Sequence, residues 1–100
     1  IMKAGTVTGD VYEASVRAIK DGPYYKYHYN GVGHGIGMFV HEVPFIRPDA
    51  TAVYKPNVVT TIEPGLYIPG WGGCRIEDQI IINEDGNENL ISVSHELIEL

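Results

Sequence analysis

The sequence predicts an α+β fold, in which one helix is followed by several short strands. Residues 8–20 carry apolar side chains at helical spacing. Residues 58–63 are rich in β-branched side chains, and residues 75–83 alternate in polarity. Both patterns are typical of strands. The pair Asp85–Gly86 follows the second segment and is a hairpin signal. We therefore expect the helix to lay its apolar face on a sheet or on other helices.

Length and composition describe an ordinary folded domain, or a piece of one. The chain has 100 residues, of which 44% are apolar and 20% are charged. It begins with Ile1, and residues 1–5 resemble the last turn of a helix entering a loop, so we expect the chain to start inside a larger protein. Seven basic and thirteen acidic residues give a net charge of −6. This balance predicts neither nucleic-acid binding nor attraction to an anionic membrane.

No stretch approaches the roughly eighteen consecutive apolar residues of a membrane-spanning helix. The single cysteine, Cys74, has no partner in the chain for a disulfide, which favours a reducing compartment and hence a cytoplasmic location. Because no base adjoins Cys74 in the sequence, we interpret it as a small, half-buried residue.

The predicted helix has a start signal and a stop signal. Thr8 or Asp10 is expected to cap its first free amides. The run Asp21-Gly22-Pro23 is expected to end it, with basic residues in the last turn. Its apolar face is predicted to consist of Val11, Ala14, Ala18 and Ile19.

An aromatic segment, residues 24–29, follows the helix and has an imperfect alternation of side chains. Because it has no basic cluster beside it, packing is the favoured interpretation over a platform for stacking bases. His28, within this segment, is predicted to be a hydrogen-bonded structural histidine.

The stretch Gly33–Pro44 holds two of the four histidines, His34 and His41, seven positions apart. The zinc motif His-Glu-x-x-His is absent, because Glu42 is followed by Val-Pro-Phe. In a straight strand an odd separation places the two imidazoles on opposite faces. A bend near Gly35–Gly37 is therefore needed if the two histidines cooperate.

The second half of the chain is predicted to contain strands and turns. Residues 47–56 are polar and contain two prolines, so we expect a surface loop. The strand over 58–63 ends with Glu63, on the same face as Thr61 and before a Pro-Gly turn signal. A short strand over 66–68 and a flexible turn over 69–73 follow.

The strand over 75–83 is expected to be continuous, with Arg75, Glu77 and Gln79 on one face. A turn over 83–86 then leads into a partner strand near 88–91. The last segment, 94–100, is compatible with either strand or helix.

Five polar residues have no obvious structural purpose: His34, His41, Glu63, Arg75 and Glu77. Carboxylates placed in or beside β-branched runs are costly unless they are exposed or paired. Two arrangements are open. A salt bridge to Arg75 at a sheet edge is purely structural, whereas a metal ion neutralises two glutamates and takes an imidazole as a further ligand. Such a ligand set suits Mn, Co, Fe or Zn, and Cys74 takes no part in it.

Three motifs in order resemble those of the pita-bread metallopeptidases. They are Gly33-His34-Gly35-Ile36-Gly37 with His41-Glu42-x-Pro44, then Thr61-Ile62-Glu63-Pro64-Gly65-Leu66-Tyr67, then Gly73-x-Arg75-Ile76-Glu77-Asp78. This family includes methionine aminopeptidases, Xaa-Pro aminopeptidases, Xaa-Pro dipeptidases (prolidases) and creatinase. The resemblance covers essentially the whole chain. It implies half of a pita-bread fold, with a curved antiparallel sheet, helices on its convex face and the site on the concave side.

The resemblance also implies a role for each of the five polar residues. His34, Glu63 and Glu77 are expected to bind two divalent metal ions (Mn, Co, Zn or Fe), with Glu77 bridging them. Glu63 is expected to act also as the general base on the shared water. His41 is expected to bind the substrate near the scissile peptide and to assist catalysis, with His34 beside it in the substrate site. Arg75 is expected to orient the ligand carboxylates.

The remaining two ligands of this family are aspartates in the N-terminal half of the fold. We expect residues 1–100 to be the C-terminal part of the catalytic domain, without those aspartates. Asp10 and Asp21 lie at the start and end of the predicted helix, so we interpret them as a cap and a solvated end and not as ligands. The chain alone is therefore expected to bind metal weakly and to lack peptidase activity.

Within the family, the motif around Arg75 and the fourteen-residue step from Glu63 to Glu77 resemble the Xaa-Pro branch. This branch implies a peptide substrate with proline at its second position and a homodimer. One departure is Asn30, at a position where the branch commonly has histidine. Aminopeptidase and dipeptidase both stay open, and the alternatives are a methionine aminopeptidase, creatinase-like hydrolysis or a non-catalytic binding module of the same fold.

Overall fold

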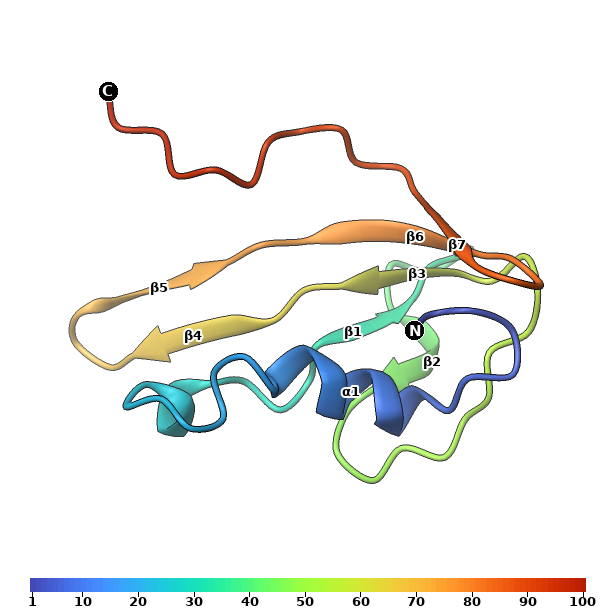
Figure 1. Cartoon of the computed structure of the whole chain (residues 1–100), viewed down its shortest axis with the longest axis horizontal. Coiled ribbons are helices and arrows are strands. Elements are labelled where there is room, and N and C mark those ends of the chain that lie inside the picture. Colours follow the sequence, from blue (N-terminus) through green and yellow to red (C-terminus); the bar gives the residue numbers. More distant parts are fainter.

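The computed structural model describes all residues, 1–100, and contains two antiparallel sheets with little helix (Figure 1). One sheet has five strands in the order β2-β1-β3-β6-β7, and the other is the hairpin β4-β5. The bounds are α1 (Thr8–Val16), the 3₁₀ turn η1 (Tyr25–Tyr27), β1 (Gly33–Gly35), β2 (Glu42–Ile46), β3 (Val59–Ile62), β4 (Gly65–Ile68), β5 (Gly72–Arg75), β6 (Asp78–Ile82) and β7 (Asn87–Asn89).

Strands β3 and β4 follow one another in one extended segment, and β5 and β6 do so in a second (Figure 1). These two segments lie side by side, and their pairing is interrupted halfway. Pairing stops after Ile62 opposite Asp78 and resumes at Gly65 opposite Arg75. The predicted continuous strand over 75–83 is thus wrong, because it is broken at Ile76–Glu77. The partner strand has Pro64 at this level, and proline has no amide hydrogen to donate to the ladder.

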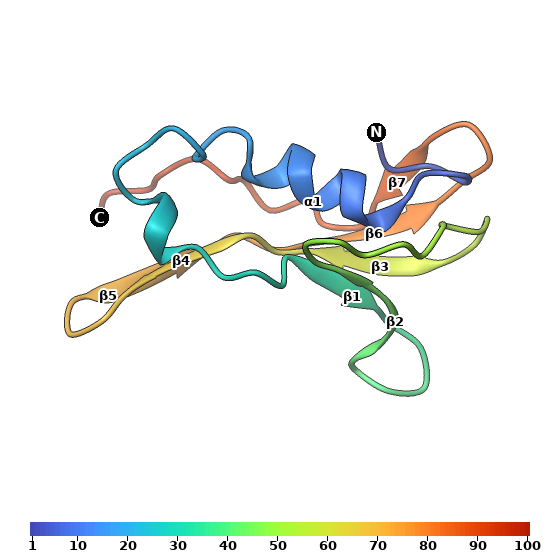
Figure 2. The same cartoon turned by 90° about the horizontal axis from the view of Figure 1, so that it is seen from below.

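Helix α1 lies across one face of the five-stranded sheet, and the loop between β1 and β2 projects away on the other side (Figure 2). Val11, Tyr12 and Val16 are its buried apolar residues. The helix is shorter than predicted, because it ends at Val16 and turns occupy the residues up to the Gly-Pro pair. Ala18, assigned to the apolar face, is exposed as a result.

The predicted side-chain cap of α1 is wrong. No side chain caps the helix. Instead, the amide of Thr8 donates to the carbonyl of Ala52 at 2.8 Å, and the amide of Gly9 donates to Ala50 at 3.1 Å. The predicted surface loop over 47–56 therefore supplies the acceptors for the first turn of the helix.

The core forms where α1 meets the sheet. Its eight members are Val11, Tyr12, Val16, Val32, Ile46, Tyr54, Ile80 and Ile82. Two hydroxyl residues of β3, Thr60 and Thr61, are also buried, and both make hydrogen bonds. The central strand β3 thus carries two buried hydroxyls that bond to the backbone of His34.

Tyr54 makes the stability of the chain sensitive to alkaline pH. Burial raises the pKa of its hydroxyl above the ordinary value of 10.0, and a contact to Thr60 opposes this in part. The folded chain therefore holds this proton at pH values where the unfolded chain loses it, so stability falls as pH rises above about 10. We expect Tyr54→Phe to weaken this fall by at most about 1.4 kcal/mol per pH unit. Urea unfolding of both proteins below and above pH 10 measures this pH dependence. The same dependence in the variant and the parent would contradict the prediction.

His28 is a hydrogen-bonded structural residue, as predicted. Its Nδ1 lies 2.7 Å from the carbonyl of Tyr25, so this nitrogen carries the proton and donates it. In the neutral ring Nε2 is then an acceptor, and the hydroxyl of Tyr12 donates to it at 2.7 Å. The rings of His28 and Tyr25 also stack, with centroids 4.4 Å apart. The packing prediction holds for Tyr25, which lies against the core, but not for Tyr24 and Tyr29, which are 56% and 58% exposed.

The C-terminal part combines a confirmed hairpin with an irregular end. Strands β6 and β7 pair as predicted, and the amide of Asn83 donates to the carbonyl of Gly86 across the turn at 2.9 Å. Residues 94–100 form neither strand nor helix. None of the helices has the length and apolar character needed to cross a membrane.

Candidate metal and substrate site

The hairpin of β1 and β2 brings the two histidines of the Gly33–Pro44 stretch together. Gly35 pairs with Glu42, and the loop between them reverses the chain. The rings of His34 and His41 meet with centroids 4.3 Å apart at an angle of 52°. The bend that the odd spacing requires is thus present, and it lies at the end of β1.

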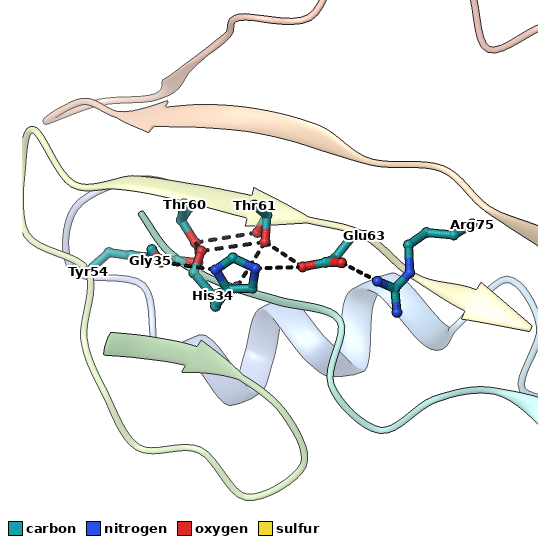
Figure 3. Close-up of polar contacts among 7 residues, drawn as sticks. All are labelled: His34, Gly35, Tyr54, Thr60, Thr61, Glu63 and Arg75. Atoms are coloured by element: carbon teal, nitrogen blue, oxygen red, sulfur yellow. Dashed lines mark hydrogen bonds and ion pairs between the residues drawn. The ribbon is translucent and has the colours of Figure 1, made fainter. Parts of the chain in front are cut away.

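Glu63 is the centre of the polar cluster in Figure 3. It directly follows β3 and is 7% exposed. Its Oε1 accepts a hydrogen bond from the hydroxyl of Thr61 at 2.9 Å and lies 3.0 Å from Nε2 of His34. Its Oε2 accepts from the Arg75 guanidinium at 2.7 Å. Each oxygen of this buried carboxylate thus accepts one hydrogen bond.

His34 is held with one nitrogen aimed at Glu63. Its Nδ1 lies 3.0 Å from the carbonyl of Gly35, an acceptor to which this nitrogen donates when it carries the ring proton. Its backbone is tied to β3, because its amide donates to the Thr61 hydroxyl and its carbonyl accepts from the Thr60 hydroxyl, both at 3.0 Å. The ring orientation is therefore set by the pairing of β1 with β3.

The geometry of His34 and Glu63 suits a bound cation. With the proton on Nδ1, the lone pair of Nε2 faces the carboxylate of Glu63, and two acceptors repel each other at 3.0 Å. A second proton on His34 or a shared cation removes the repulsion. An imidazole whose other nitrogen donates to a carbonyl is the usual form of a metal-binding histidine, and imidazole with carboxylate suits Zn, Mn, Fe or Co.

Arg75 connects the site to the β4-β5 hairpin. Besides its contact to Glu63, its guanidinium lies 5.5 Å from the centre of the Tyr67 ring. The sequence left open whether a salt bridge or a metal compensates the glutamates. The Arg75–Glu63 ion pair is present, and it occupies only one oxygen of the carboxylate.

The structure does not join Glu77 to this cluster. Glu77 is exposed in the break between β5 and β6, beside the C-terminal residues 91–98. No three His, Cys, Asp or Glu side chains of the chain gather closely enough to hold a metal ion. Asp10 lies in the first turn of α1, and Asp21 is exposed beyond it. The ligand role assigned to Glu77 stays a prediction.

One feature of the site was missed from the sequence, and the interpretation of one nearby residue was wrong. The hydroxyl of Thr60 bonds to His34, and the hydroxyl of Thr61 bonds to Glu63. The position of Thr61 on the same strand face as Glu63 was a signal for the second contact. Cys74 is exposed and not half-buried, so that interpretation is wrong. It lines an apolar groove of about 750 Å³ between the β4-β5 hairpin and the aromatic segment, with Trp71 and Tyr27.

The model of metallopeptidase family M24 matches residues 1–84. The Xaa-Pro dipeptidase of Pyrococcus furiosus is 38% identical over 96 residues, which cover 96% of this chain and 28% of the relative. A solved Xaa-Pro dipeptidase from Bacillus anthracis superimposes with a TM-score of 0.92 at 39% identity, over 99% of this chain and 28% of that one. The X-Pro aminopeptidase of Thermotoga maritima gives 0.89 at 34%, over 96% and 27%.

The chain belongs to metallopeptidase family M24. Its fold is α+β and of the pita-bread type, as the sequence motifs implied. The chain spans about a quarter of the length of the relatives that it matches.

Proposed function

We propose that the protein to which this chain belongs is a metal-dependent exopeptidase that hydrolyses the bond between an N-terminal residue and proline. The observation that carries the proposal is the His34–Glu63 pair, in which Nε2 of the ring lies 3.0 Å from a buried carboxylate. Membership of the family and similarity to both Xaa-Pro dipeptidases and an X-Pro aminopeptidase support the substrate class. Either of these two activities is compatible with the site.

Residues 1–100 are proposed to be the C-terminal part of the catalytic domain. His34, Glu63 and Glu77 would be three of the ligands of two divalent ions (Mn, Co, Zn or Fe), and two aspartates from the N-terminal half would complete the set. When bound, the ions would lower the pKa of a shared water and polarise the substrate carbonyl. The chain alone then lacks a complete site.

The residues of the chain divide the remaining work. Arg75 holds Oε2 of Glu63, which leaves Oε1 directed to His34 and free to accept a proton from the attacking water. His41, exposed beside His34, donates a hydrogen bond to the peptide near the scissile bond. The substrate is thus bound on the side of the β1-β2 loop, opposite α1 (Figure 2).

The proposed partners are a peptide with proline at its second position and, in the assembled protein, a second copy. A cytoplasmic location is proposed from the lone Cys74. The net charge of −6 supports neither nucleic acid nor an anionic membrane as a partner. Asn30, at the position where the Xaa-Pro branch commonly has histidine, has its side-chain oxygen 3.4 Å from the Tyr12 hydroxyl.

Peptide hydrolysis by the full-length protein tests the proposal. The protein is stripped of metal with a chelator, reconstituted with Mn²⁺, Co²⁺, Zn²⁺ or Fe²⁺, and assayed on Ala-Pro, Ala-Pro-Ala and Met-Ala-Ala. We expect no hydrolysis without metal, and release of alanine from one or both proline peptides with it. Preference between the two proline peptides separates dipeptidase from aminopeptidase. Cleavage of Met-Ala-Ala alone, or metal-independent cleavage, contradicts the proposal.

A further inference from the structure

The loop between β1 and β2 carries His41 but has little packing of its own. Its central side chains project into solvent, since Met38 is 96% exposed, Phe39 72% and Val40 69%. Apolar burial of these side chains therefore contributes little to the loop conformation. Within this chain, polar contacts hold the loop in the shape that presents His41 to His34.

Glu42, the first residue of β2, folds back into this loop. Its Oε1 accepts a hydrogen bond from the amide of Phe39 at 2.8 Å. Its carboxylate also fills the space beside Gly37, where an added Cβ would collide with Oε2. The amide of Gly37 in turn donates to the carbonyl of Phe39 at 3.2 Å. The Glu42 side chain thus contacts two positions of the loop, Gly37 and Phe39.

His41 depends on this arrangement because its own ring is weakly held. The imidazole is exposed and its contact within the chain is the ring of His34, 4.3 Å away. His41 stands between the loop and β2, directly before Glu42. The direction of the His41 ring is consequently set by the backbone before and after it. The pairing of Glu42 with Gly35 fixes the backbone after His41, and the hydrogen bond of the Phe39 amide fixes the backbone before it.

We infer that Glu42 is a positioning residue, which acts through the loop to hold the His41 imidazole against His34 where it meets the peptide. The inference rests on the proposed function for the role of His41, but not for the geometry. A carboxylate suits the task because a charged acceptor strengthens the bond to a backbone amide. The glycine at position 37 leaves room for that carboxylate.

Kinetics of the metal-loaded full-length protein form the first part of the test. Glu42→Ala is expected to lower kcat/KM for the better proline peptide about tenfold, because displacing a substrate-binding group is costly. Glu42→Gln keeps an acceptor oxygen of the same reach, so it restores most of the activity. Glu88→Ala, on the exposed strand β7, is the matched control and leaves the rate unchanged.

A double-mutant cycle separates positioning from general destabilisation. If Glu42 acts through His41, adding Glu42→Ala to His41→Ala costs nothing further. Two independent losses that multiply would overturn the inference, and so would a Glu42→Ala variant as active as the parent.

Solution NMR of the same variants gives a readout that does not require activity. In Glu42→Ala the amide of Phe39 is expected to exchange about tenfold faster with solvent, and the cross-peak between the His34 and His41 rings to disappear. Retention of both overturns the inference. A wild-type protein that cleaves no proline peptide would refute the proposed function, while this NMR comparison still decides whether Glu42 holds the loop.

Discussion

Glu63→Gln in the full-length protein is expected to lower kcat/KM for proline peptides by about 10²- to 10⁴-fold, the range for loss of a general base. The amide has the shape of the carboxylate, and the hydroxyl of Thr61, now 2.9 Å from Oε1, is still able to donate to it. It loses the charge that faces His34 and Arg75, and it cannot accept a proton from water. Steady-state kinetics with saturating metal measure the effect.

Two controls accompany the Glu63 variant. Glu88→Gln removes a charge from the exposed strand β7 and is expected to leave kcat/KM unchanged. Far-UV circular dichroism verifies that Glu63→Gln is folded, since the carboxylate is buried and its ion pair contributes to the native structure. A folded variant that retains the parent's kcat/KM would exclude Glu63 as base and ligand.

Arg75→Met is expected to weaken metal binding by the full-length protein by about 10- to 100-fold, the usual cost of losing a group that orients a ligand. The guanidinium is the partner of Glu63 Oε2 at 2.7 Å, and without it the carboxylate is free to turn away from His34. Arg75→Lys is expected to recover only part of the loss, because an ammonium lacks the planar group that covers the Tyr67 ring. Calorimetric metal titration measures both variants.

Arg47→Met is the matched control for Arg75. Arg47 is exposed directly after β2 and forms no ion pair with an acidic side chain of the chain, so metal affinity is expected to stay at the parent value. Equal losses in the Arg47 and Arg75 variants would mean that overall charge, and not the contact with Glu63, sets the affinity.

Local signals in the sequence predicted the elements that depend on local physics. The turn residues Asp85–Gly86 predicted the β6-β7 hairpin, and the odd spacing of His34 and His41 predicted a bend between them. The interpretation of His28 as structural was also correct. Each of these inferences used residues close in the sequence, where turn geometry and side-chain alternation dominate.

Two of the failed predictions concern contacts between distant segments. The strand over 75–83 breaks because of a proline on the opposite strand, and α1 takes its first acceptors from residues 50 and 52. Likewise, the 3.0 Å approach of His34 to Glu63 follows from pairing of β1 with β3, which no periodicity reveals. The family motifs pointed to both residues, but the threonine hydroxyls that hold them emerged only from the fold.

The acceptors of α1 have a further consequence for the order in which the chain folds. Because the amides of Thr8 and Gly9 bond to carbonyls from the connection between β2 and β3, the first turn of the helix is completed by residues far along the chain. A helix of only nine residues is marginal in isolation. We therefore expect α1 to form together with that connection and not before it.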